Sequence, residues 1–292
     1  MTIEEARKEI IKGIREIYEE DEAKNISELL LERITNLSRT KQIAKKNEAL
    51  SASQTEFLDQ SIERLQRHEP VQYITHEAWF AGMKFYVDKN VLIPRPETEE
   101  LVDWVIKEVK NKNSPPAGRA GKFRILDIGT GSGCIAVALK NNLPNAEVWA
   151  CDISEEALNA ARINADSLNA TIDFVPLDFL DKEQRKQLPH IDIIVSNPPY
   201  VPQKDKNEMK KNVTDHEPAI ALFVPDEDPL IFYSAIADFG REKLNEKGSI
   251  YVEIHENLGE PVKNLFQIKG YNSIRIKKDL QEKERMIKIS LE

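Results

Sequence analysis

The tetrapeptide Asn197-Pro198-Pro199-Tyr200 is the segment best suited to carry out chemistry. It follows IDIIVS (191–196), which reads as a buried strand, and open α/β sheets bind ligands at the carboxyl ends of such strands. The two prolines fix the backbone and leave carbonyl oxygens without competing N–H groups. A planar NH2 group can donate its two hydrogens to the Asn197 side-chain oxygen and the Pro198 carbonyl, while the Tyr200 ring offers a flat face. An ordinary proline-rich turn is the alternative.

A glycine-rich loop predicts a second binding element. The segment 125–133, ILDIGTGSG, leads from a predicted strand into a predicted helix, and its glycines let the backbone turn tightly and approach a ligand. A dinucleotide fold would place its third glycine at position 134, where this chain has Cys134. The spacing favours S-adenosylmethionine, which has no pyrophosphate to bind at the helix N-terminus; a mere tight turn is the alternative. The expected contact residues are Gly129, Thr130, Gly131, Ser132 and Gly133.

Acidic residues follow the next two predicted strands. Asp152 ends EVWACD (147–152), where a carboxylate can accept hydrogen bonds from both ribose hydroxyls of an adenosine. The alternative is that it caps the following helix, in competition with Ser154. Asp178 and Phe179 stand where a polar group meets the adenine amino group and an apolar ring packs on the base. A loop aspartate and a core phenylalanine are equally open readings of this pair.

These residues require an α/β scaffold to position them. Strand-like and helical segments alternate from residue 123 onward, which is typical of a parallel sheet with helices on both faces. The expected fold class is therefore α/β, a Rossmann-like sheet that suits the S-adenosylmethionine favoured by the glycine loop. The last two runs, NSIRI and MIKIS, are expected to form an antiparallel edge pair. The strand-like segments before them are FRILDI, EVWACD, IDFVP, IDIIVS and SIYVEI.

Composition excludes several other classes. The 292 residues include 41 Lys and Arg against 50 Asp and Glu, a net charge of −9 that disfavours non-specific duplex binding. No apolar run reaches the roughly 18–20 residues of a membrane span, and the N-terminus lacks a signal-peptide pattern. The two cysteines and five scattered histidines indicate neither a disulfide framework nor a metal site. The expectation is a cytoplasmic protein.

Asn-Pro-Pro-Tyr after such a strand resembles the amino-methyltransferases that act on planar nitrogens of adenine, guanine or glutamine. Within that group the chain is similar to the protein-(glutamine-N5) methyltransferases of peptide chain release factors, the HemK/PrmC-type family. Two departures are Glu253-Ile254-His255, where the family has Glu-Ile-Gly, and Glu282, where the family has glycine. The segments that carry the closer match are 69–74 (EPVQYI), 92–99 (LIPRPETE), Glu217-Pro218 with Ala221-Leu222, and Asp279-Leu280 through Arg285.

The resemblance implies a reaction. A methyl group passes from S-adenosylmethionine to the side-chain amide nitrogen (N5) of the glutamine in the GGQ motif of class 1 peptide chain release factors. Asn197, Pro198 and Tyr200 would be catalytic, the whole tetrapeptide would bind the substrate, and Asn197 would also border the donor. No metal, nucleic-acid or membrane partner is expected.

Three domains are expected. Residues 1–70 read as a helical bundle that recognises the substrate, in which Ser53-Gln54-Thr55-Glu56 forms a capping box. Residues 71–93, beginning with the β-like run VQYI, read as a β-hairpin linker. Residues 94–292 read as the S-adenosylmethionine-binding methyltransferase domain.

Two competing functions remain open. A nucleic-acid amino-methyltransferase would use the same clamp on the NH2 of adenine or guanine, and Lys204, Lys206, Lys210 and Lys211 after the tetrapeptide keep this alternative open. A non-enzymatic donor-binding adaptor of the translation machinery is the second; the intact tetrapeptide argues against it. A nicotinamide dehydrogenase is more distant, because the tetrapeptide has no role in hydride transfer.

Overall fold

A computed structural model describes residues 1–111 and 123–291. Its contacts divide the chain into two compact units. The helical unit comprises Met1–Glu77 with Met209–His216, and the α/β unit comprises Ala78–Glu208 with Glu217–Glu292. In the described ranges, no helix combines the length and the apolar character needed to cross a bilayer.

Amphipathic helices build the helical unit. In α1 the apolar residues recur every three to four positions, so Ile3, Ala6, Ile10 and Ile14 all face the core. The unit's helices are α1 (Ile3–Ile14), α2 (Glu20–Thr35), α3 (Arg39–Ala44), α4 (Ala52–Gln66), α5 (Val71–Thr75) and α10 (Lys211–Thr214).

The capping box of α4 begins two residues earlier than predicted. Ser51, not Ser53, is the N-cap: its hydroxyl accepts from the Gln54 N–H at 3.2 Å, and the Gln54 side-chain oxygen accepts from the Ser51 N–H at 2.9 Å. Ser51-x-x-Gln54 and Ser53-x-x-Glu56 are overlapping patterns, and the first is the one whose two reciprocal bonds form.

The predicted 71–93 hairpin is wrong at both ends. VQYI lies in the short helix α5, whose Val71 and Ile74 are three positions apart and pack into the helical core. The hairpin itself is confined to β1 (Ala78–Phe80) and β2 (Met83–Phe85), which pair antiparallel. Residues 90–93 lie outside it. A short apolar run fits a strand and a buried helical turn equally well, so periodicity alone could not separate them.

A seven-stranded sheet forms the α/β unit and confirms the predicted fold class. Its order is β10-β11-β9-β6-β3-β4-β5, with β5, β4, β3, β6 and β9 parallel and β11 antiparallel to both neighbours. The predicted edge pair is thus present. The sheet strands are β3 (Arg124–Ile128), β4 (Glu147–Asp152), β5 (Asp173–Pro176), β6 (Ile191–Ser196), β9 (Leu244–Glu253), β10 (Ser273–Lys278) and β11 (Glu284–Ser290).

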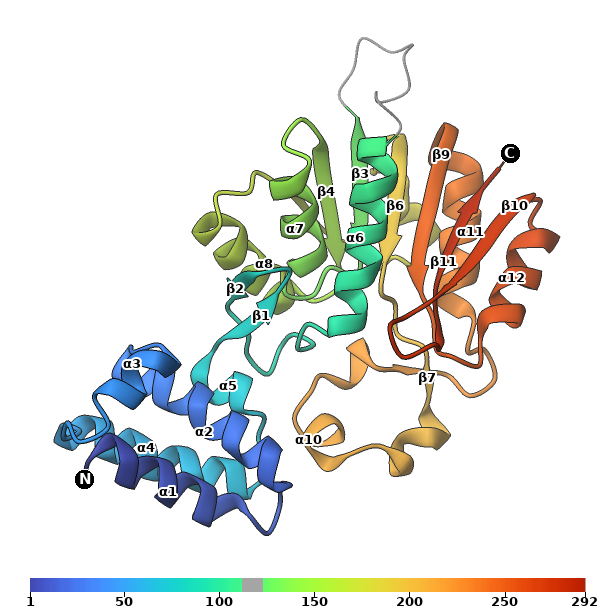
Figure 1. Cartoon of the computed structure of the whole chain (residues 1–292). Coiled ribbons are helices and arrows are strands. Elements are labelled where there is room, and N and C mark those ends of the chain that lie inside the picture. Colours follow the sequence, from blue (N-terminus) through green and yellow to red (C-terminus); the bar gives the residue numbers. More distant parts are fainter. Residues whose placement is uncertain (112–122, 292) are drawn as a thin grey trace. The chain divides into compact units, whose positions relative to one another are not determined.

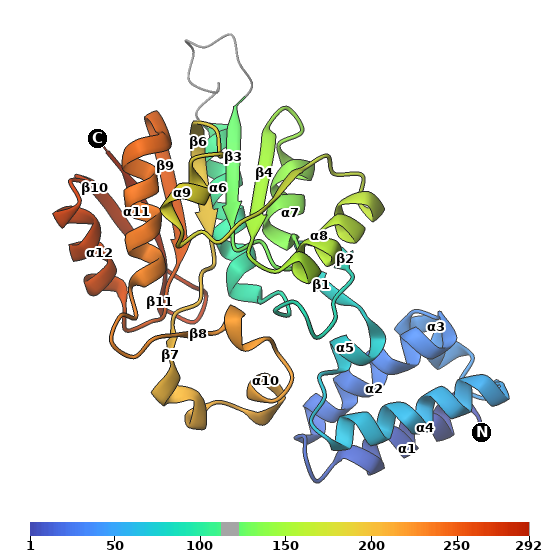
Figure 2. The same cartoon turned by 180° about the vertical axis from the view of Figure 1, so that it is seen from behind.

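Helices cover both faces of this sheet. One face packs on α6 (Pro96–Asn111), α7 (Cys134–Asn142) and α8 (Glu155–Ser167), and the other on α11 (Ile231–Lys243) and α12 (Gly259–Ile268). Figure 1 shows α6 and α7 in front of the strands, and Figure 2, from behind, shows α11 and α12. The remaining short elements are α9 (Lys182–Arg185), β7 (Val201–Pro202), η1 (Gln203–Glu208), η2 (Ala219–Ala221) and β8 (Phe223–Val224).

Strand register brings the predicted motifs together at the edge of the sheet formed by the carboxyl ends of its parallel strands. Ile128 at the end of β3 pairs with Ser196 at the end of β6 and with Cys151 in β4. The glycine loop, Asp152 and Asn197 each follow directly. Between β3 and β6 the chain order reverses, with β4 and β5 on one side and β6 and β9 on the other. Such switch points are where open α/β sheets bind ligands.

Candidate active site

A cavity of about 230 Å³ lies at this edge, at the carboxyl ends of β3, β4, β5 and β6. It joins most of the residues that the sequence singled out. Its walls include Gly129, Gly131, Asp152, Asp178, Phe179, Asn197, Pro198 and Pro199. Four predicted contact residues, Thr130, Ser132, Gly133 and Tyr200, are not among the described residues that line it.

Backbone conformation accounts for the glycine loop. Gly131 has φ +54°, which favours glycine, and a side chain there would meet no atom within 4 Å, so the loop borders open space. Gly133 has φ +79°, and an added Cβ would lie 3.0 Å from the Cβ of Ala161 in α8. Gly131 thus faces the cavity, whereas Gly133 permits close packing of α8.

Thr130 and Ser132 are buried and hold the loop together. The Thr130 hydroxyl donates to Asp127 Oδ2 at 2.6 Å, and the Ser132 carbonyl accepts from the Asn164 side chain at 2.8 Å. The Thr130 side chain and the Ser132 main chain therefore have structural partners.

Asp152 is oriented by the backbone around it. Its Oδ2 accepts from the Gly131 N–H at 2.9 Å and its Oδ1 from the Ser154 N–H at 3.0 Å. The helix cap is made by Ser154, whose hydroxyl accepts from the Ala157 N–H at 3.1 Å. Burial raises the pKa of Asp152, although the backbone hydrogen bonds oppose that rise. Asp152 is thus a half-buried carboxyl group at the cavity wall.

Asp127 is a buried carboxyl group next to the site that the sequence reading missed. It is fully buried in β3, and its Oδ1 has no hydrogen-bond partner within the described chain. Burial raises the pKa of Asp127 to about 7, hydrogen bonds from Thr130 and Ala136 oppose this, and the charge of Asp152 adds to it. Asp127 does not line the cavity itself, whereas its charged neighbour Asp152 does.

Phe179 serves the core and the cavity together. It is 5% exposed, packs edge-on against Phe239 with ring centroids 5.4 Å apart, and also lines the cavity. Asp178 next to it caps its own loop, since its Oδ1 accepts from the Leu180 N–H at 2.8 Å. Both readings of the pair are therefore compatible with the geometry.

Two residues distant in the sequence hold the Asn197 side chain: Thr98 binds it directly, and Glu253 acts through Thr98. The Asn197 side-chain NH2 donates to the Thr98 hydroxyl at 3.0 Å, and Thr98 donates to Glu253 Oε2 at 2.6 Å. Tyr200 donates to the other oxygen, Oε1, at 3.4 Å, and its ring lies tilted against His255. Burial raises the pKa of Glu253 to about 7, although the Thr98 hydrogen bond opposes that rise. Asn197, through Thr98, and Tyr200 are thus both hydrogen-bonded to the buried carboxyl group of Glu253.

An ion pair supports the opposite wall. Arg95 Nη2 lies 2.6 Å from Oε1 of Glu217, whose Oε2 accepts from the Ile93 N–H at 3.2 Å. Burial raises the pKa of Glu217, while the Arg95 charge opposes this. Leu92 and Pro218, beside these residues, line the cavity. The sequence signal for this pair was its presence in two of the family-like segments.

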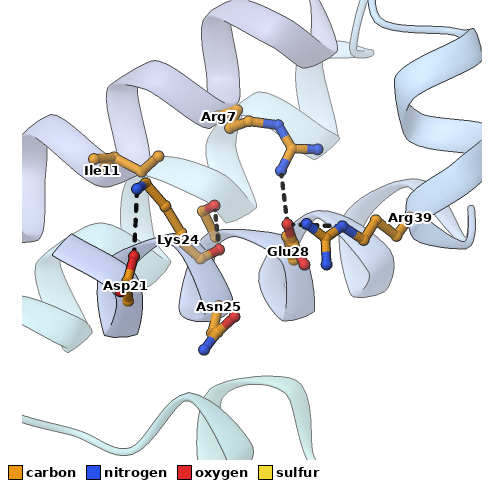
Figure 3. A pocket seen from close by; sticks show the side chains of 8 residues that line it. Arg7, Ile11, Asp21, Lys24, Asn25, Glu28 and Arg39 are labelled. Carbon is orange, nitrogen blue, oxygen red and sulfur yellow. Dashed lines mark hydrogen bonds and ion pairs between the residues drawn. The ribbon is translucent and has the colours of Figure 1, made fainter.

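A second hollow, of about 570 Å³, lies in the helical unit (Figure 3). Its charged side chains pair with one another. Glu28 bridges Arg39 at 3.0 Å and Arg7 at 3.8 Å, and Lys24 pairs with Asp21 at 3.4 Å. It contains none of the motif residues that line the first cavity. Across the described residues, no group of three metal-ligating side chains occurs.

Comparison with known proteins gives consistent matches. The model of the PrmC N-terminal domain matches residues 5–75, and that of the methyltransferase small domain matches residues 115–216. A solved structure of the hMettl16 catalytic domain in complex with MAT2A 3'UTR hairpin 6 has a TM-score of 0.55 at 15% identity, covering 84% of each chain. That likeness shows a shared fold.

Curated relatives match nearly the whole chain. A release factor glutamine methyltransferase of Flavobacterium psychrophilum is 39% identical over 99% of both chains. Another, of Bacteroides thetaiotaomicron, is 44% identical over 95% of this chain and 96% of its own. A third, of Streptococcus pneumoniae, is 41% identical over 86% of this chain and 85% of its own. By this identity over its full length, the chain belongs to the release factor glutamine methyltransferases.

Proposed function

We propose that the cavity binds S-adenosylmethionine and that Asn197 and Pro198 present the side-chain amide of a release factor glutamine to it. The protein is an S-adenosylmethionine-dependent methyltransferase that methylates release factor glutamine. One observation carries the assignment of the site: the Asn197 NH2 is bound to Thr98, so the amide oxygen is left to accept from a substrate. Asn197 also lines the cavity that contains the glycine loop.

The residues around the cavity fit this donor. Asp152 supplies a carboxylate for the ribose hydroxyls, and Phe179 supplies an apolar wall for the base. Gly129 and Gly131 leave open space beside the backbone, and the Asp152 carboxylate in the cavity wall complements a positive charge. When bound, S-adenosylmethionine supplies a methyl group activated by its sulfonium.

The protein's task is then to position and activate an amide nitrogen. Its lone pair is delocalised into the carbonyl, so the nitrogen is a weak nucleophile. Asn197 Oδ1 and the Pro198 carbonyl accept the two N–H groups and direct the lone pair toward the donor. Orientation of this kind supplies up to about 7–11 kcal/mol in favourable cases. As positive charge develops on nitrogen, both hydrogen bonds strengthen, which stabilises the transition state more than the ground state.

We extend the proposal to the finer identity of the partner. The target is N5 of the glutamine in the GGQ motif of class 1 release factors, and the reaction takes place in the cytoplasm, where these factors act. The helical unit takes part in recognising them, which its match to the PrmC N-terminal domain supports. No nucleic acid or membrane contact is needed for this reaction.

The test is methylation of purified partners. The protein is incubated with labelled S-adenosylmethionine and either class 1 release factors or RNA and DNA, and peptide masses locate any gain of one CH2. We expect label only on the GGQ glutamine. Label on nucleic acid would favour the amino-methyltransferase alternative, and donor binding without transfer to any partner would favour an adaptor.

A further inference from the structure

We propose that Glu253 is a positioning residue for methyl transfer. Acting through Thr98, it fixes the side-chain amide of Asn197 so that the oxygen, not the NH2 group, meets the substrate. This inference rests on the proposed function. It concerns a residue at the end of β9, 56 positions after Asn197 in the sequence.

The first step is the direction of the hydrogen bonds. An ionised carboxylate only accepts, and Glu253 is ionised above its pKa of about 7. At such pH Thr98, at 2.6 Å from Oε2 of Glu253, uses its single hydrogen in that bond. The Thr98 oxygen can then serve Asn197 only as an acceptor. Of the two ends of a carboxamide only the NH2 donates, so this end takes the 3.0 Å contact to Thr98. Oδ1 is thereby directed away from Thr98.

The second step is that a neutral side chain could not impose this direction. A carboxamide at position 253 can donate to the Thr98 oxygen as well as accept from its hydroxyl. The Thr98 hydrogen is then free to point at Asn197, and Asn197 can turn its oxygen toward Thr98 at little cost. The flipped form presents NH2 to the NH2 of the substrate, where neither group can accept.

The third step is the cost of keeping a carboxyl group here. Glu253 is 2% exposed, and no ion pair to it occurs among the described residues. Arg285 and Glu97 act on it only through longer-range charge, while Thr98 and Tyr200 bind one oxygen each. Tyr233 donates to its main-chain carbonyl at 2.9 Å, which fixes the strand end without the side chain. The strand end is therefore held without the carboxyl group, whose two oxygens serve Thr98 and Tyr200 instead.

The experiment compares Glu253→Gln, Thr98→Val and Thr98→Ser in the full chain. Methyl transfer to a release factor is followed in a single turnover at saturating donor, and the donor Kd is measured separately. We call the hydrogen-bonded chain Glu253–Thr98–Asn197 the relay. Its loss should slow methyl transfer about 10- to 100-fold in the Gln and Val variants, the range expected for an unmet buried hydrogen bond. The donor Kd should not change, and Thr98→Ser, which keeps the hydroxyl, should restore most of the rate. The matched control is Glu260→Gln, at an exposed position of α12.

A double variant tests the relay itself. Because both changes break one chain of hydrogen bonds, Glu253→Gln with Thr98→Val should be no slower than the slower single variant. A wild-type rate in either single variant, multiplied losses, or a parallel fall in donor affinity would overturn the inference. If Glu253→Gln fails to fold, the contrast between Val and Ser at position 98 still decides. An active Asn197→Ala variant would instead refute the proposed site.

Discussion

In the proposed mechanism, Asn197 is the residue on which the reaction depends most directly. Asn197→Ala removes the oxygen that accepts from the substrate amide, and the glycine loop and Asp152 remain in place. We expect turnover to fall by at least about 100-fold, since one transition-state acceptor is lost, while the donor Kd stays within about threefold. Steady-state methylation and calorimetric donor titration measure the two quantities.

The control for that change is Asn272→Ala, at an exposed position of the same unit. It should leave both quantities unchanged. An Asn197→Ala protein that methylates release factors at the normal rate would show that the amide is not held by this side chain.

Asp152 should govern donor binding instead. Asp152→Ala leaves the ribose hydroxyls without an acceptor and also frees the Gly131 N–H that Oδ2 now holds. The expected loss is about 1–3 kcal/mol of binding free energy, or roughly 5- to 150-fold in donor Kd. Transfer at saturating donor should change much less. Asp173→Ala, at an exposed residue of β5, is the control, and equal donor affinity in both variants would exclude a ribose contact.

Motif residues could be predicted from sequence, whereas their supports could not. The strand, loop and helix around Gly129–Gly133 and the strand before Asn197 are local patterns, and each placed its motif correctly at a strand end. Thr98 and Glu253 are 155 positions apart, and Glu253 reads as one polar residue in the strand SIYVEI. Asp127 stands in an apolar run for the same reason. Only the fold shows that these groups are buried and share partners.

At the scale of elements, long segments were predicted better than short ones. The predicted strand IDIIVS matches β6 at both ends because its apolar core, Ile193–Val195, is β-branched and stands between polar residues. VQYI was predicted as a strand but lies in a helix. The five residues after Pro70 make one helical turn, and its apolar side is defined only by contact with α2 and α4. Tertiary contact decides the conformation of such short runs.

The turn between β10 and β11 contains a departure that the structure explains. Glu282 has φ +63°, a left-handed conformation that favours glycine, the residue expected there from the family. The Asp279 carboxylate accepts from the Gln281 and Lys283 N–H groups and so fixes the turn around it. Glu282 is thus held in a strained conformation by its neighbours.

Two substitutions at this turn should therefore rank in an unusual order. Glu282→Gly should be more stable than Glu282→Ala by about 1 kcal/mol, because only glycine adopts this φ without a steric cost. At the exposed helical residue Glu63 in α4, the order should reverse by a similar amount. Urea unfolding of the four variants measures both differences. The same order at both sites would show that residue 282 is not strained.

At the scale of the whole molecule, the α/β unit contains carboxyl groups whose pKa values are shifted in opposite directions. Burial raises the pKa values of Asp127 and Glu253 to about 7, far above the ordinary values of 3.8 and 4.5. For Glu108 burial also acts upward, but hydrogen bonds and charges from Lys288 and Arg275 outweigh it and lower the pKa to about 2. Stability should respond to pH through both sets.

The signs of the two contributions predict an optimum in weak acid. Asp127 and Glu253 keep their protons up to about pH 7 in the folded state, so the stability they contribute is lost as pH rises from about 4 through 7. Glu108 contributes in the opposite sense, and its stabilisation is lost as pH falls below about 4.5. The net charge of −9 at pH 7 adds repulsion at the upper end. The free energy of unfolding should therefore be highest near pH 5.

Tryptophan fluorescence can follow this optimum in the α/β unit alone, because Trp79, Trp104 and Trp149 all lie there. Urea titrations between pH 4 and 8 should show stability falling above pH 5. In Asp127→Asn, which cannot ionise, that fall should shrink by about 1 kcal/mol or more. Glu108→Gln should instead reduce the loss on the acid side. A stability that rises steadily to pH 8 in the unsubstituted protein would mean that Asp127 and Glu253 are already ionised in the fold at a lower pH than their raised pKa values imply.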